Sequence, residues 1–113
     1  MSEQLLPHLL ARCEEAVLAT EGVLAAARSE LRTLMTRDGK VSAAAVDSHQ
    51  HEAHGLAWLA TYVEALRQML RWARELEHEK KFGEIERLIL LAAFGEYLAQ
   101  IAGGIPMSQN EIV

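Results

Sequence analysis

Apolar residues recur along the chain at the spacing of α-helices, and turn signals divide this pattern into three segments. The turn signals are Asp38-Gly39, Gly83 and the run Gly103-Gly104-Ile105-Pro106. The pattern predicts helices over residues 3–36, 42–79 and 82–102, followed by a tail over residues 103–113. A seam with a seven-residue repeat in the first helix is typical of packing at a shallow crossing angle. The seam consists of Leu6, Leu10, Cys13, Val17, Thr20, Leu24, Ala27, Leu31 and Leu34.

The middle segment carries two apolar stripes side by side. The first consists of Leu56, Leu59, Val63, Leu66, Leu70 and Ala73, and the second of Trp58, Tyr62, Ala65, Met69, Trp72 and Leu76. Because neighbouring positions on a helix are about 100° apart, the two stripes cover more than half of its circumference. Two stripes imply two partner helices, or one partner helix and a second copy of the chain. Large residues of the second stripe are the expected interface: Trp58, Tyr62, Met69, Trp72 and Leu76.

The third segment is apolar all round its expected helix. The run from Leu88 to Phe94 contains no polar residue, and the flanking Glu86, Arg87 and Glu96 do not gather on one face. A helix of this kind is normally buried on most sides, which three helices of one short chain can hardly achieve. We therefore predict an all-α fold, an antiparallel bundle of three long helices completed by dimerisation. Packing against further domains of a longer protein is the second expectation.

Composition supports a helical protein and excludes several classes. Of the 113 residues, 18 are Ala and 17 are Leu, whereas only 5% are aromatic, so helices are favoured over a β-sandwich. The length fits a single domain, over 1–113, or a fragment of a longer protein. A net charge of −5 argues against nucleic acid as a partner. No apolar run approaches the roughly 20 residues of a membrane span, and the single cysteine fits the cytoplasm.

One group of residues has the types and spacing of a metal site. Asp47, His51 and His54 are four and three residues apart, so a continuous helix would place them on one face. A carboxylate and two imidazoles could hold zinc or iron, which makes a small metal-binding bundle the alternative function. The same histidines could also belong to a pH-sensitive interface.

Other candidate chemistry has weaker support. Cys13 lies among apolar residues of the first seam, which predicts a buried structural thiol. If Glu96 is buried in the apolar third helix, it needs a hydrogen-bonding or charged partner. Trp58, Tyr62 and Phe94 could line a ligand pocket of a small enzyme or carrier, although such aromatic residues usually fill a core or an interface. No catalytic residue is assigned.

Two stretches carry a resemblance to a known family. Residues 53–67 (AHGLAWLATYVEALR) and 94–109 (FGEYLAQIAGGIPMSQ) resemble parts of the N-terminal helical accessory region of bacterial acyl-CoA dehydrogenase-family flavoproteins. The resemblance implies oxidation of acyl-CoA thioesters with FAD by the full-length family, in a later dehydrogenase core that this chain does not contain. It therefore implies no cofactor in this chain. The implied function is a non-catalytic helical interaction domain that forms a homodimer or packs on a dehydrogenase core.

Overall fold

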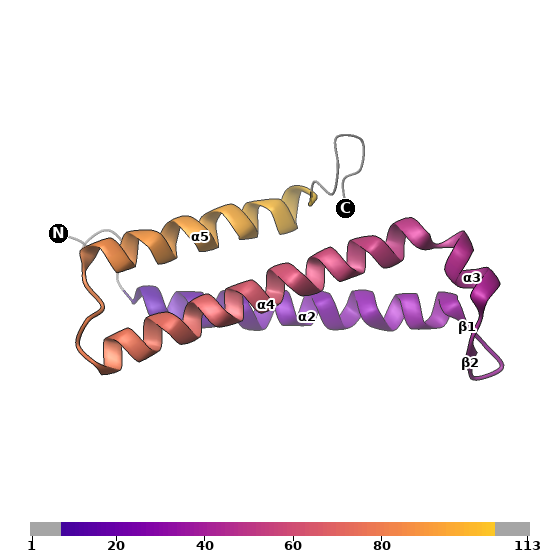
Figure 1. Cartoon of the computed structure of the whole chain (residues 1–113), viewed down its shortest axis with the longest axis horizontal. Coiled ribbons are helices and arrows are strands. Elements are labelled where there is room, and N and C mark those ends of the chain that lie inside the picture. Colours follow the sequence, from indigo (N-terminus) through magenta and orange to yellow (C-terminus); the bar gives the residue numbers. More distant parts are fainter. Residues whose placement is uncertain (1–7, 106–113) are drawn as a thin grey trace.

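A computed structural model describes residues 8–105 of the chain as a long helical hairpin with one further helix beside it (Figure 1). The elements are α2 (Leu9–Met35), β1 (Thr36–Arg37), β2 (Lys40–Val41), α3 (Ala43–Ser48), α4 (Gln50–His78) and α5 (Glu84–Gly103). The predicted all-α class is confirmed for these residues. They contain four helices and a two-stranded ribbon, where the sequence predicts three helices. Most of the predicted tail lies outside the described residues.

The hairpin turns at Asp38 and Gly39. Both residues have positive φ, 54° and 78°, the conformation that a two-residue hairpin loop with the sequence Asp-Gly requires. The loop joins β1 to β2, with Thr36 opposite Val41 and Arg37 opposite Lys40. The side chain of Ser42 then accepts a hydrogen bond from the Ala45 amide and begins α3 as an N-cap. The turn therefore reverses the chain between its two long helices.

The middle helix is interrupted at His49, where the sequence predicts one helix over residues 42–79. His49 has φ −122° and ψ 34°, outside the helical range, so the short α3 ends there and α4 begins at Gln50. The His49 amide still bonds to the carbonyls of Ala45 and Val46 at 3.1 Å. The break changes the direction of the chain but leaves few backbone groups without a partner. Its cause is local backbone geometry, which apolar periodicity does not report.

The core is formed by α2 and α4 packed antiparallel, with α5 lying along the pair (Figure 1). The larger cluster of buried residues draws on all three helices: Leu9, Cys13, Val17, Leu66, Leu70, Ala73, Leu90 and Phe94. The smaller one joins Leu24 of α2 and Leu59 and Val63 of α4 to Ile105, which follows α5. The first stripe of α4 therefore supplies most of its buried residues, facing α2.

The third long helix is too short to cover the hairpin. At 1.5 Å per residue, the 20 residues of α5 span about 30 Å and the 29 residues of α4 about 43 Å. Large apolar side chains stay exposed, among them Ile85, Leu88, Ile89 and Leu91 of α5.

Within residues 8–105, none of the helices has the length and apolar character needed to span a bilayer.

Candidate interaction site

The predicted interface residues of α4 are partly covered within the same chain. Trp58, Tyr62, Met69, Trp72 and Leu76 are all half-buried. Met69 and Trp72 pack against the larger core cluster, and Trp58 and Tyr62 pack against the smaller one. The two stripes of α4 thus have two partners within one molecule, α2 and α5. Only the exposed edges of these two stripes are available to another molecule.

A polar network joins α4 to α5 at Tyr62. Its ring stacks on Tyr97 with centroids 4.7 Å apart, and its hydroxyl donates a hydrogen bond to the Gln100 side chain. The Gln100 amide donates in turn to Glu96 Oε1 at 2.6 Å. Glu96 is exposed, so it does not need the buried partner that the sequence analysis considered. The network sets the position of α5 along α4 by directional contacts in addition to apolar packing.

The candidate metal residues do not form a cluster. Asp47 belongs to α3, whereas His51 and His54 belong to α4, so the break at His49 removes the shared helical face. Asp47 accepts a hydrogen bond from Gln50 at 3.3 Å, and the Nε2 atom of His54 accepts one from the Trp58 indole at 3.0 Å. No group of three His, Cys, Asp or Glu side chains suited to a metal ion occurs within residues 8–105. The described residues therefore do not support the metal-binding alternative.

Cys13 is a buried thiol in the seam between α2 and its neighbours. Its side chain is 3% exposed within the larger core cluster. Burial raises the pKa of this thiol from 9.0 to about 11, because the thiolate would lose its hydration. The protonated thiol packs as a small apolar side chain and is a poor nucleophile at neutral pH.

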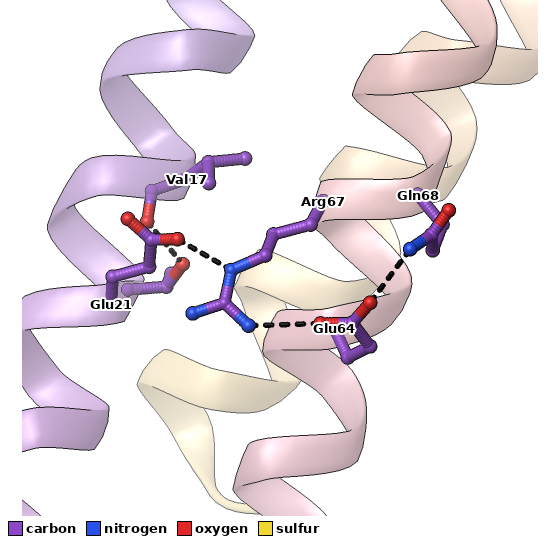
Figure 2. A network of polar contacts seen from close by, with 6 residues as sticks. Val17, Glu21, Glu64, Arg67 and Gln68 are labelled. Atoms are coloured by element: carbon purple, nitrogen blue, oxygen red, sulfur yellow. Dashed lines mark hydrogen bonds and ion pairs between the residues drawn. The ribbon is translucent and has the colours of Figure 1, made fainter.

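A band of ion pairs crosses from α4 to α2 on the side of the hairpin away from α5 (Figure 2). Arg67 donates to Glu21 at 2.5 Å and to Glu64 at 2.9 Å, and Arg74 pairs with Glu14. These hydrogen bonds, that to Glu21 first, raise the pKa of Arg67. The side chains are one-third to one-half exposed, so each pair adds well under about 1 kcal/mol. Their main effect is to set the register of the two helices.

These ion pairs between helices were not predicted from the sequence. A signal for them exists in the spacing. Glu14 and Glu21 are seven residues apart, as are Arg67 and Arg74, so antiparallel helices in one register bring both pairs together. Spacing alone could not show which helix faces which, because that depends on the turn geometry.

The groove below these ion pairs has a volume of about 510 Å³. Val17 and Leu70 form part of its apolar floor, and Arg67, Arg71 and Arg74 lie along its rim. Each of these three arginines is paired with a carboxylate. A flavin dinucleotide would need unpaired donors for its pyrophosphate and a glycine-rich turn opening a helix. The arginines of the groove rim are already paired with carboxylates and Gly103-Gly104 ends α5, so this groove is poorly suited to FAD.

An unpartnered apolar surface lies on the outer side of α5, which carries four of the eight large apolar side chains exposed among the described residues. Figure 1 shows α5 along one edge of the molecule, with no described helix or strand beyond it. Ile85 is 68% exposed and Leu88 is 45% exposed, although each would normally favour burial. This exposure agrees with the expectation that three helices cannot bury the third segment fully. Clustered apolar exposure of this kind usually marks an interaction site.

Comparison with known proteins gives one informative similarity. No family model matches the chain. Over 109 residues, 96% of this chain, it is 56% identical to a protein of Cereibacter sphaeroides named (2S)-methylsuccinyl-CoA dehydrogenase. The chain resembles an accessory region of an acyl-CoA dehydrogenase-family protein. It spans only 20% of that relative's length, and the family resemblance inferred from residues 53–67 and 94–109 is confirmed.

Proposed function

We propose that this chain is a non-catalytic helical accessory region of an acyl-CoA dehydrogenase-like flavoprotein of the cytoplasm and packs on its dehydrogenase core. The observation that carries the proposal is the coverage of the match. Almost the whole chain aligns at 56% identity, but with only one fifth of the relative. In that case the FAD site and the catalytic residues of such an enzyme belong to the other four fifths. The role of the chain is then to shape or stabilise the assembly.

Two structural features support an accessory role over a complete enzyme. The arginines along the groove lined by Val17 and Leu70 are paired with carboxylates of the same chain, which leaves this groove poorly suited to FAD. Apolar side chains exposed on α2, among them Leu18 and Val23, are suited to burial against a dehydrogenase core. The lone, buried Cys13 is compatible with a reducing compartment. We therefore assign the accessory function to the exposed apolar surface of the chain, and not to a cluster of reactive groups among the described residues.

A chimeric enzyme tests this proposal. In it, the matching fifth of the C. sphaeroides relative is replaced by this chain, and the chimera is compared with the unaltered relative. We expect the chimera to bind FAD stoichiometrically and to oxidise (2S)-methylsuccinyl-CoA within about tenfold of the unaltered rate, since surface differences rarely exceed about 1.4 kcal/mol in effect. The separate 113-residue chain should show no flavin absorbance after incubation with FAD.

A matched control guards against a general folding defect. A second chimera carries Leu66→Glu, which places a charge at a fully buried position of the chain. This chimera should lose flavin or aggregate if the chain packs on the core as a folded unit. Full flavin loading and activity in the Leu66→Glu chimera, or stoichiometric FAD binding by the separate chain, would refute the proposed function.

A further inference from the structure

The exposed side of α5 carries a regular seam. Its residues follow alternating spacings of three and four, all of them apolar or glycine and all exposed: Ile85, Leu88, Ala92, Gly95, Ala99 and Ala102. Such spacing is the pattern of a helix that packs along a second helix with knobs in holes. Leu91 and Ile89 flank the seam, and the charge of Glu96 lies at its margin. Within the described chain, this seam has no partner.

Nothing among residues 8–105 requires a glycine at position 95. A Cβ atom built at this position meets nothing within 4 Å, and its φ is not positive. A glycine in the middle of a helix lowers helix stability compared with alanine. A glycine at this position permits the close approach of another backbone, which the described residues do not supply. A partner helix on this seam could therefore approach most closely near Gly95.

The seam changes from large to small residues along its length. Ile85 and Leu88 lie at the N-terminal end of α5, whereas Ala99 and Ala102 lie at its C-terminal end. A second α5 running antiparallel places the large residues of each copy opposite the small residues of the other. In this arrangement Ile85 of one copy lies opposite Ala102 of the other, and Leu88 lies opposite Ala99. Ala92 lies opposite Gly95 at the centre. A parallel copy would instead leave gaps where small residues meet.

We propose that α5 is a homodimerisation seam, in which two copies of this chain pair their α5 helices antiparallel about a two-fold axis between Ala92 and Gly95. The change from large to small residues along α5 makes the seam complementary to itself. This favours a second copy of the chain as the partner, because a two-fold contact requires one surface that fits itself. The inference goes beyond the proposed function, since it concerns this chain alone.

The size of the seam determines how stable the dimer is. From Ile85 to Ala102 the seam is about 26 Å long, and a strip of helical width covers on the order of 300–400 Å² per copy. Stable interfaces bury about 800 Å² per partner. We therefore expect the dimer of the separate chain to be weak and reversible.

Sedimentation equilibrium of the 113-residue chain tests the association, from about 1 µM to about 1 mM. We expect a shift from monomer to dimer across this range, and Leu88→Glu should weaken association at least about tenfold because it buries a charge. The control is Leu18→Glu on α2, where the side chain is 62% exposed but outside the seam. Both variants should keep the helicity of the unaltered chain, and Leu18→Glu should change association less than about twofold.

Crosslinking tests the orientation. Chains with Leu88→Cys are mixed with chains with Ala99→Cys and oxidised. Antiparallel pairing brings residue 88 of one copy opposite residue 99 of the other, within disulfide reach, and keeps two residues 88 far apart. The mixed disulfide should therefore form faster than either homodisulfide, while the buried Cys13 reacts slowly.

Each remaining result contradicts the proposal in a recognisable way. A chain that stays monomeric up to about 1 mM, or a dimer that Leu18→Glu weakens and Leu88→Glu does not, removes the seam as the dimer contact. Rapid Leu88→Cys homodisulfide formation excludes the antiparallel arrangement. A monomer whose α5 face contacts the dehydrogenase portion of an active chimera replaces the second copy as occupant and leaves the proposed function intact.

Discussion

Replacing Gly95 with alanine should stabilise the monomer, although the glycine lies on a surface that we assign to a partner. The prediction follows from two observations. Gly95 lies within α5 in an exposed position, and a Cβ atom there would meet no other atom within 4 Å. Gly22 of α2 has the same properties and lies outside the seam. It therefore provides a matched control for the helical contribution alone.

The expected magnitude comes from helix propensity. Glycine is about 0.8–1.0 kcal/mol less favourable than alanine in a helix interior, and no steric term opposes the change at either position. Gly95→Ala and Gly22→Ala should each raise the free energy of unfolding by close to 1 kcal/mol. With a urea dependence of about 1–3 kcal/mol per molar, the unfolding midpoint should rise by roughly 0.3–1 M.

Urea unfolding followed by far-ultraviolet circular dichroism measures this, at protein concentrations low enough for the chain to be monomeric. The same variants are then compared by sedimentation equilibrium at high concentration. Gly95→Ala should weaken the dimer there, because it adds a methyl group where the two backbones approach most closely, whereas Gly22→Ala should not. If Gly95→Ala destabilises the dilute monomer while Gly22→Ala stabilises it, Gly95 serves the internal packing of the chain and our reasoning is wrong.

Three other predictions concern the interior. Leu66→Ala, at a side chain with no exposure, should cost about 2–5 kcal/mol of unfolding free energy, whereas Leu18→Ala should cost less than about 0.5 kcal/mol in the same urea assay. The Cys13 thiol has its pKa raised from 9.0 to about 11 in the folded chain, so it supports stability fully below pH 9 and loses that contribution as pH rises to 11. This loss is at most about 2.7 kcal/mol, and it should be absent from Cys13→Ala when unfolding is measured across that range. Tyr62→Phe should cost about 1 kcal/mol through the lost hydrogen bond to Gln100, and a double-mutant cycle with Gln100→Ala that gives no coupling would show the bond to be unimportant.

The middle of the chain shows where prediction from sequence succeeded and where it failed. The two stripes of α4 indicated two partners, and both exist as α2 and α5. The metal hypothesis failed because it required Asp47 to share a continuous helix with His51 and His54. The chain leaves the helical conformation at His49, and the apolar pattern continues across that break without a sign of it.

The interface prediction needed information that the sequence lacks. Trp58 and Trp72 are large and sit at helical spacing, which indicates burial but does not identify what buries them. In the structure α5 covers this stripe and leaves its own opposite side exposed. The exposed apolar surface is therefore on α5, whereas the sequence predicted it on α4. A pattern of apolar positions reports which residues avoid water, whereas only the packing of all helices reports which of them are left in contact with it.

The sequence by itself determined the all-α class, the approximate extents of the long helices, the reversal at Asp38-Gly39 and the excess of apolar surface. These properties depend on residues close together in the chain, so local periodicity and turn chemistry are sufficient. Tertiary structure alone decided that Arg67 and Arg74 pair with Glu21 and Glu14, that Asp47 belongs to a different helix from His51 and His54, and that one side of α5 is left exposed. These properties depend on contacts between helices, whose relative rotation is set by the geometry of the turns and by the length of α5.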